Sequence, residues 1–215
     1  MFPLNAVVFP DEVTQLHVFE ERYRVLVREL LEVPEAERVF GVTAIREGYE
    51  VGEHGSSSLH TTGTLVRLTN VEPYDDGRFD ITVLGLTPMR LHSMLPYRVG
   101  LPPRGEIEEL PDPPGLNENN LVGRMHETFY RYRDAMSGLG MQIDPRLPAD
   151  PRRLSWVLAR RCFFNLADQQ SLLDAPTPRE RLNLVAFMLG QEIRAMTALP
   201  SLPATDIART RWSPN

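Results

Sequence analysis

The sequence predicts an α+β protein in which a strand-rich part precedes a helical part. Up to about residue 110, apolar residues occur in short runs or alternate with polar ones, as in strands. Pro111–Gly115 resists both helix and strand, because its three prolines lack backbone donors. Beyond it, apolar residues recur at helical spacing. We expect a β subdomain over 1–110, a linker over 111–116, a helical bundle subdomain over 117–197 and an extended tail over 198–215.

Several apolar segments in the first part have the length and bounding turn residues of strands. We expect strands at Val7–Phe9, Val13–Phe19, Arg38–Arg46 and Gly63–Val71. Asp76-Gly77 predicts a hairpin, because alternation resumes directly after it from Phe79. A further alternating set indicates a strand with one wetted face: Met89, Leu91, Leu95, Tyr97, Val99 and Leu101.

One helix interrupts the strands. It is predicted by apolar residues on one helical stripe, Tyr23, Leu26, Val27, Leu30 and Leu31. The segment Leu16–Val27 passes from strand to helix with Glu20 and Glu21 at the junction. The helix dipole stabilises negative charge there by about 0.3–1 kcal/mol. A structural role therefore explains this charged junction without catalysis.

The second part contains three apolar helical stripes and one short turn near Ser171–Leu173. The stripes comprise Leu121, Met125, Phe129, Tyr132 and Met136; Leu154, Val157, Leu158 and Cys162; and Leu182, Val185, Leu189, Ile193 and Met196. Thr177–Glu180 is a capping box with proline at the first helical position, so it predicts the start of the last helix. Gly138-Leu139-Gly140 follows a helical pattern and therefore predicts a helix end instead of a phosphate-binding loop.

All 23 basic residues are arginine, and the sequence contains no lysine. Arginine stays protonated, so a Ser-Lys dyad, a Schiff base and a Walker lysine are excluded.

The net charge of -6 disfavours binding of nucleic acid. We expect a cytoplasmic protein for three reasons. The sequence shows no secretory signal, no apolar run approaches the roughly 18 residues of a membrane span, and a single cysteine agrees with a reducing compartment. We expect Cys162 to be a buried structural thiol.

The histidines do not group into a catalytic or metal-binding pattern. His54 and His60 flank a serine run, but the sequence places no orienting carboxylate or oxyanion donor near them, which favours a flexible loop. His17 and Glu20 are three residues apart at a strand end and do not share a helical face. We therefore expect no catalytic residue, no metal site and no cofactor.

Several segments follow the order of a known family. Phe2–Pro10, followed by Leu16–Tyr23, resembles the opening of the N-terminal substrate-binding domain of Lon proteases. Later segments are also similar to that family: Phe40–Val42, Gly63–Arg67, Asp76–Phe79, Gly85, Arg90-Leu91 and Thr177–Leu182. The resemblance covers about residues 1–196. Asp11, Glu21 and Pro88 depart from the family's usual glycine, proline and arginine, at positions that could touch a ligand.

The resemblance implies a small PUA-like β barrel with one helix, packed against an α-helical bundle. In Lon this unit recruits unfolded or tagged proteins, whereas separate AAA+ and peptidase domains carry out degradation. We expect neither of those domains in this chain.

We therefore expect a non-catalytic module that captures unfolded or extended polypeptides at a strand edge or in a cleft between barrel and helices. A protease or chaperone is a further expected partner, and the oligomeric state stays open. The candidate binding residues are Phe19, Arg22, Tyr23 and Arg90, although the pattern favours core packing of the aromatic pair and simple solvation of the arginines. An RNA- or small-ligand-binding module is the alternative, by analogy with the PUA-like fold.

Overall fold

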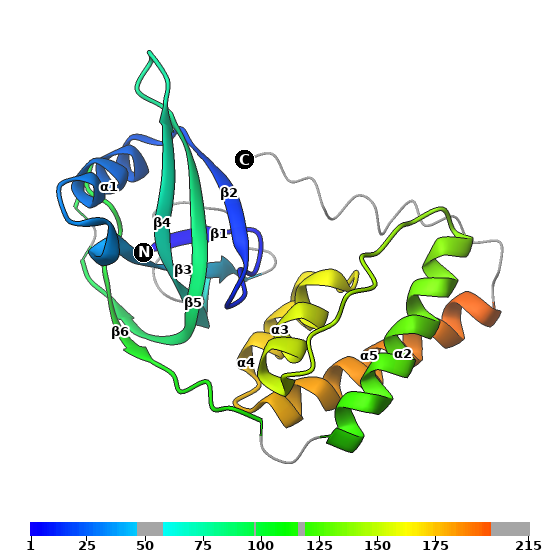
Figure 1. Cartoon of the computed structure of the whole chain (residues 1–215). Helices are drawn as coiled ribbons and strands as arrows, with labels where there is room; N and C mark the ends of the chain where they lie inside the picture. The colour runs from blue at the N-terminus through cyan, green and yellow to red at the C-terminus, as the bar shows by residue number, and fades with distance from the viewer. Residues whose placement is uncertain (47–57, 97, 116–118, 199–215) are drawn as a thin grey trace. The chain divides into compact units, whose positions relative to one another are not determined.

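A six-stranded sheet with one α-helix is followed by four α-helices in the computed structural model of the chain (Figure 1). The structure describes residues 1–46, 58–96, 98–115 and 119–198, and every statement below concerns these ranges. The chain forms two compact units, Met1–Pro111 and a second unit that begins at Asp112. The predicted α+β class is confirmed. The serine-rich loop with His54, and the expected tail from residue 199 onward, lie outside the described residues.

The first unit contains one mixed sheet. Its strands are β1 (Phe2–Leu4), β2 (Val13–Val18), β3 (Val39–Ile45), β4 (Leu59–Pro73), β5 (Phe79–Met94) and β6 (Gly105–Glu109). The strand order is β1-β3-β4-β5-β2, and β6 pairs with the second half of β5. Among the strand pairs of the described residues, β1–β3 is parallel and the others are antiparallel. Since β1 and β2 do not pair with each other within the described ranges, the hydrogen-bonded sheet is open.

Two apolar cores lie on opposite faces of this sheet. Helix α1 (Glu21–Leu31) packs on one face through the predicted stripe, of which Tyr23, Leu26, Val27 and Leu30 are buried. The second core, around Leu65 and Met89, lies on the face away from α1, because side chains alternate along β4. The short 3₁₀ helix η1 (Glu35–Glu37) connects α1 to β3.

The predicted hairpin between β4 and β5 is confirmed. Gly77 has a φ of 82°, which favours glycine, and its N–H donates to the Tyr74 carbonyl at 2.9 Å. Arg24 of α1 donates from Nε to the Gly77 carbonyl at 2.6 Å and from Nη2 to the Asp76 carbonyl at 3.1 Å. These bonds attach the turn to the helix.

The strand predicted at Val7–Phe9 is wrong. The three residues are buried but irregular, and the first strand is instead Phe2–Leu4. Their polar groups bond to side chains: Thr64 Oγ1 donates to the Val8 carbonyl at 2.6 Å, and the Phe9 N–H donates to the Glu12 carboxylate at 2.8 Å. An apolar run signals burial, which an irregular segment can also achieve when side chains satisfy its backbone.

The alternation predicted to continue to Leu101 ends at Met94. Beyond it, Leu95, Val99 and Leu101 are exposed, at 45%, 91% and 38% of their surface, whereas Tyr97 lies outside the described residues. Gly100, with a φ of 77°, belongs to a turn that leads into β6. The charged sequence of β6 carries no apolar alternation, which is why the sequence did not indicate this strand.

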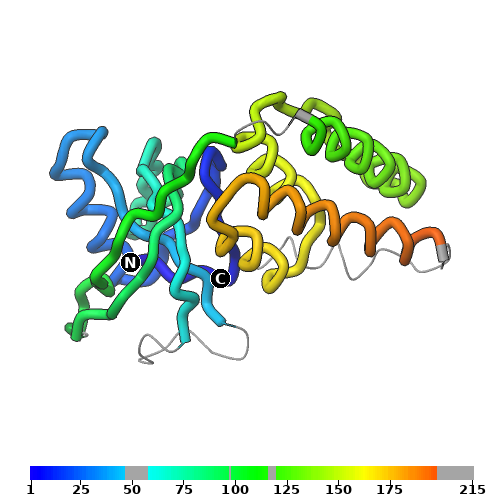
Figure 2. Tube along the Cα trace, turned by 90° about the horizontal axis from the view of Figure 1, so that it is seen from below, coloured from blue at the N-terminus to red at the C-terminus, as the bar shows by residue number. Residues whose placement is uncertain are grey.

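The second unit contains α2 (Asn119–Gly138), α3 (Pro151–Arg161), α4 (Leu166–Asp174) and α5 (Pro178–Ala198). Helix α5 contacts each of the other three, and Figure 2 shows α5 running beside α2. The residues of the first two predicted stripes are buried, and so are Leu182, Val185 and Leu189 of α5. The turn expected near Ser171 is the end of α4. The helix start predicted at Thr177 is confirmed: the Glu180 N–H donates to Thr177 Oγ1 at 3.3 Å, and this hydroxyl donates to the Glu180 carboxylate at 3.1 Å.

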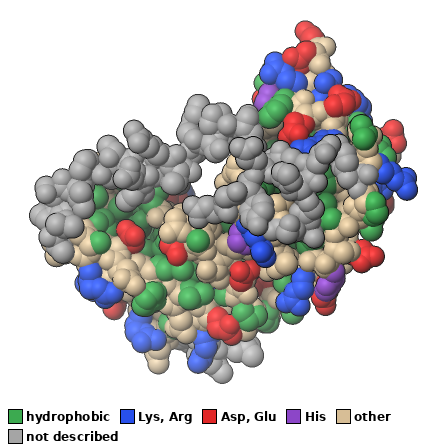
Figure 3. All heavy atoms as spheres, turned by 180° about the vertical axis from the view of Figure 1, so that it is seen from behind, with side chains coloured by type: hydrophobic (Ala, Val, Ile, Leu, Met, Phe, Trp, Pro, Cys, Tyr) green, Lys and Arg blue, Asp and Glu red, His purple; other side chains and the backbone are tan. Residues whose placement is uncertain are grey.

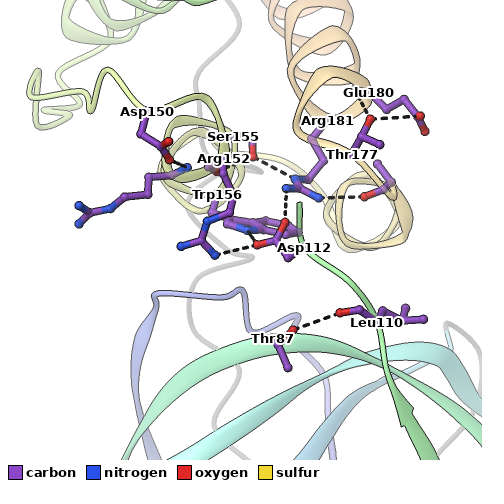
Figure 4. A network of polar contacts seen from close by, with 12 residues as sticks. Thr87, Leu110, Asp112, Asp150, Arg152, Ser155, Trp156, Thr177, Glu180 and Arg181 are labelled. Carbon is purple, nitrogen blue, oxygen red and sulfur yellow. Dashed lines mark hydrogen bonds and ion pairs between the residues drawn. The ribbon is translucent and has the colours of Figure 1, made fainter. Parts of the chain in front are cut away.

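A buried polar network begins the second unit (Figure 4). Asp112 accepts hydrogen bonds from Arg181 Nη2 at 2.7 Å, Trp156 Nε1 at 2.8 Å and Arg152 Nη1 at 2.9 Å. Arg181 is 1% exposed, and its guanidinium lies 3.6 Å from the centroid of the Trp156 ring system. Sequence spacing did not suggest this network, because Asp112 stands in a proline-rich segment typical of a linker.

Candidate functional site

Strand β2 forms an edge of the sheet, because β5 is its only partner within the described ranges. The Gly85 N–H donates to the Glu12 carbonyl at 2.8 Å, and bonded and non-bonded residues alternate along an antiparallel pair. The register from Val13 to Val18 is regular. The N–H and C=O groups of Val13, Gln15 and His17 therefore point away from β5. These three residues form a short template for another strand.

The side chains of the same three residues lie on the face away from α1. Val13 is 67% exposed, Gln15 is exposed, and 39% of the His17 side chain is accessible. Leu16 and Val18, which alternate with them, pack toward the core under α1. The edge thus combines free backbone groups with accessible side chains.

Next to this edge, His17 lies in a cluster with Phe19, Tyr74, Arg78 and Asp80, here termed the His17 cluster. The carboxylate of Asp80 is shared: Oδ1 lies 2.6 Å from His17 Nδ1, and Oδ2 accepts from the Tyr74 hydroxyl at 2.6 Å. The His17 ring stacks on Phe19 at 6.2 Å and meets the Tyr74 ring edge-on at 5.8 Å between centroids. Arg78 lies over the Tyr74 ring at 5.4 Å.

Hydrogen bonds in the His17 cluster hold Asp80 in its ionised form. The Tyr74 hydroxyl and then His17 lower the pKa of Asp80 below its ordinary value of 3.8, because both stabilise the carboxylate. The same carboxylate raises the pKa of Tyr74, which keeps the phenol protonated. The cluster is therefore a fixed, partly charged aromatic surface. Figure 3 shows acidic, basic and hydrophobic side chains together on the projecting end of the β4–β5 hairpin.

The four residues expected from the sequence occupy different environments. Phe19 is 41% exposed and belongs to the His17 cluster. Tyr23 is 3% exposed and stacks on the Phe2 ring at 4.3 Å in the core. Arg22 pairs with Glu20 at 2.6 Å and lies over the Tyr23 ring at 4.8 Å. These three are sequence neighbours around the start of α1.

Arg90 is exposed and lies elsewhere on the sheet. It stands eleven residues (90 − 79) beyond Phe79, the partner of Val18, which corresponds to roughly 35 Å along a straight strand. Its register partners are Thr62 and Glu108. The structure therefore does not bring Arg90 to the His17 cluster.

Sequence reasoning missed Tyr74, Arg78 and Asp80 as site residues, because it assigned this stretch to the hairpin turn and its flanks. One signal could have found Asp80. Once β2 and β5 pair with the register that their apolar positions require, His17 and Asp80 fall directly opposite each other.

Within the described residues, no group of three histidine, cysteine or acidic side chains could hold a metal ion. Cys162 is 4% exposed, and burial raises the pKa of its thiol well above the usual range. The thiol is therefore neutral and inert at physiological pH. None of the helices in the described ranges has the length and apolar character needed to cross a bilayer.

The open mixed sheet with α1, followed by four helices, defines a class of α+β domains. The family model of the ATP-dependent protease La (LON) substrate-binding domain matches residues 1–191. The chain belongs to this family.

Curated relatives agree with this assignment. Lon protease of Xanthomonas oryzae pv. oryzae is 26% identical over 192 residues, which cover 88% of this chain and 22% of the relative. Lon protease 1 of Thermus thermophilus is 26% identical over 199 residues, with 88% and 24% coverage, and Lon protease of Escherichia coli K12 is 25% identical over 191 residues, with the same coverage. The chain thus spans less than a quarter of the length of these relatives.

Two solved structures share the fold. The N-terminal domain of Mycobacterium avium complex Lon protease has a TM-score of 0.63 at 13% identity and covers 88% of this chain and 96% of that one. A Lon N-terminal domain protein from Xanthomonas campestris has a TM-score of 0.60 at 22% identity, with 85% and 92% coverage. At these identities the likeness is one of fold.

Proposed function

We propose that the chain is a non-catalytic recognition module that captures extended segments of unfolded polypeptides by strand addition at β2. The observation that carries this proposal is the edge of β2, where the backbone groups of Val13, Gln15 and His17 have no strand partner among the described residues and lie beside accessible side chains. Strand addition binds many sequences, because the hydrogen bonds involve only the ligand backbone. The family's substrate-binding description supports the same role.

The energetics of this edge favour modest affinity. Three N–H and three C=O groups offer at most six hydrogen bonds, each worth about 0.5–1.5 kcal/mol net. Association and ordering of the ligand offset part of this gain. Apolar ligand side chains beside Phe19 and Val13 add to it. The result is micromolar affinity, or about -8 kcal/mol, which suits a module that holds and releases its ligands.

The four residues expected from the sequence have different roles in this proposal. Phe19 contacts the ligand as part of the His17 cluster, and Arg22 borders it. Tyr23 has an indirect role, because its buried ring fixes the start of α1. Arg90 contacts only a ligand that extends along β5. The module works in the cytoplasm without a cofactor and delivers its ligands to a protease or chaperone.

The architecture implied by the family resemblance is also part of the proposal. We propose that the first unit is a PUA-like barrel whose edge strands β1 and β2 are not joined by hydrogen bonds within the described ranges. The apolar cores on both faces of the sheet support this proposal. The second unit is an α-helical bundle, supported by the contacts of α5 with the other three helices. The segment after Pro111 links them.

RNA or small-ligand binding is the alternative function, and it requires a contiguous arginine face. In the described ranges, many arginines pair with carboxylates, among them Arg22, Arg24, Arg28, Arg78, Arg104, Arg133, Arg146, Arg152, Arg161 and Arg181. This mixed charge supports polypeptide binding over RNA binding.

The substitution Gln15→Pro tests the proposal. Proline removes the N–H that points away from β5 and leaves the bonds between β2 and β5 in place. Fluorescence anisotropy with a labelled, permanently unfolded protein should show weaker binding by this variant, whereas Gln15→Ala should bind like the wild type. Undiminished binding by a folded Gln15→Pro variant would contradict strand addition at β2.

A further inference from the structure

Helix α5 carries a row of accessible side chains on the side opposite its buried residues Leu182, Val185 and Leu189. This row, here termed the α5 stripe, comprises Glu180, Asn183, Phe187, Gln191 and Arg194, all of which are exposed. These residues recur at intervals of three or four positions, so they share one face of the helix. The α5 stripe is therefore continuous over about four turns.

Phe187 stands at the centre of the α5 stripe and is 61% exposed. Leu184 and Gly190 flank it on the helix surface and are partly buried. Among the described residues, a Cβ added at Gly190 would meet just the flexible end of Arg194, with Nη1 at 3.7 Å. The surface beside the Phe187 ring therefore has room for a side chain from another helix.

The charges of the α5 stripe are placed symmetrically about Phe187. Glu180 lies seven residues before it and Arg194 seven residues after it (187 − 180 and 194 − 187). Glu180 uses Oε1 for the Thr177 hydroxyl at 3.1 Å, and neither Glu180 nor Arg194 forms an ion pair among the described residues. The stripe thus ends in two opposite charges that have no counter-ion there.

We propose that the α5 stripe binds a second copy of the chain, with the two α5 helices antiparallel about a two-fold axis at Phe187. Such an axis brings the same surface of both copies together. The two Phe187 rings meet at the axis. On either side of it, Leu184 faces the partner's Gly190, Asn183 faces the partner's Gln191, and Glu180 faces the partner's Arg194. This inference does not depend on the proposed function.

The spacing and the charges of the stripe fix the packing geometry. Glu180, Phe187 and Arg194 repeat every seven residues, which keeps two helices in contact at a shallow crossing angle of about 20° and an axial separation of about 8–10 Å. The oppositely charged ends then lie level with each other. A parallel pair would instead place like charges together, which is unfavourable. The charges therefore favour the antiparallel arrangement.

Sedimentation velocity of the full chain, over a concentration series that reaches the millimolar range, tests the inference. One pair of helices makes a small interface, so the wild type should form a weak dimer that dissociates on dilution. Phe187→Ser should weaken association by about tenfold or more, because it removes the central aromatic contacts. Val99→Ser is the control, since Val99 is 91% exposed but lies in the first unit, and it should leave association unchanged.

Charge exchange tests the antiparallel orientation. Arg194→Glu places two glutamates together at each end of the interface and should weaken association. The double variant Glu180→Arg/Arg194→Glu should restore it, and Thr177 still caps the helix there through the N–H of residue 180. Circular dichroism and thermal unfolding establish that each variant is folded.

Cysteine pairing provides an independent test of orientation. Under mild oxidation, a mixture of Asn183→Cys and Gln191→Cys chains should form a disulfide-linked heterodimer, because these positions face each other across the axis. Neither variant alone should cross-link, since the native Cys162 is buried. Cross-linking of either variant with itself would mean parallel helices and would overturn the pairing.

Three further results would contradict the inference. The first is a wild type that stays monomeric throughout the series. The second is a dimer that folded Phe187→Ser leaves intact, because another surface would then hold it together. The third is a folded charge-exchange double variant that associates no better than Arg194→Glu. Polypeptide capture at β2 is measured separately and does not change with any of these results.

Discussion

Asp112 and Arg181 form a buried ion pair with a distance of 2.7 Å between Oδ1 and Nη2. The two side chains are 6% and 1% exposed. Arg181 also donates from Nε to Ser155 at 2.9 Å and from Nη1 to the Ala175 carbonyl at 3.0 Å. Burial lowers the pKa of Arg181, although Asp112 counteracts this effect. The pair fixes the first residue of the second unit to α5.

Removal of one member of this pair should strongly destabilise the chain. Asp112→Ala leaves the guanidinium of Arg181 buried without its counter-ion and should lower the free energy of unfolding by about 3–5 kcal/mol. Chemical denaturation measures this loss. Asp144→Ala is the control, because its pairs with Arg146 and Arg161 are more exposed, and it should have a much smaller effect. A loss for Asp112→Ala as small as that expected for Asp144→Ala would show that the Asp112 network is not structurally important.

The His17 cluster predicts a depressed pKa for Asp80. A carboxyl whose pKa is lower in the folded state contributes stability above its unfolded pKa, near 3.8, and loses this contribution as the pH falls through the folded pKa. NMR titration of the Asp80 carboxyl should therefore give a midpoint below 3.8. In Tyr74→Phe the hydrogen bond from the Tyr74 hydroxyl to Asp80 is gone, so the midpoint should rise. An unchanged midpoint in that variant would refute the role of Tyr74.

Cys162 should be unreactive in the folded chain. Its thiol is buried, and the raised pKa keeps it protonated. A thiol-specific reagent at mildly alkaline pH should label it only after denaturation. Cys162→Ala should stay folded, because the site needs only a small apolar side chain. Rapid labelling of the native chain would mean that the thiol is accessible and not structural.

The purified chain should not degrade casein with or without ATP. A sequence without lysine cannot form a Ser-Lys dyad, and the family match is to a substrate-binding domain. Gel electrophoresis of casein over time provides the measurement. Reproducible cleavage that a point substitution in this chain abolishes would overturn the non-catalytic assignment.

Local patterns in the sequence predicted those elements that short-range physics determines. The Tyr23–Leu30 stripe, the Asp76-Gly77 turn and the Thr177 capping box each depend on residues a few positions apart. The irregular Val7–Phe9 segment was not predictable in this way, because its backbone is satisfied by the distant Thr64 and by Glu12. A local pattern carries no information about such partners.

The candidate site was only partly predictable for the same reason. The sequence indicated Phe19 and a strand edge. The His17 cluster, in contrast, combines His17 of β2 and Asp80 of β5 with residues of the turn between β4 and β5, and their proximity depends on strand register. Asp112 and Arg181 are 69 residues apart, and no spacing rule connects them.

Residue-resolved amide exchange of β2 tests the central claim most directly. In the free chain, the amides of Thr14, Leu16 and Val18 should be protected by β5, whereas those of Val13, Gln15 and His17 should exchange quickly. Saturation with an unfolded polypeptide should slow exchange at Val13, Gln15 and His17 and leave the other three amides unchanged. Fast exchange of these three amides in the saturated complex would contradict strand addition at β2.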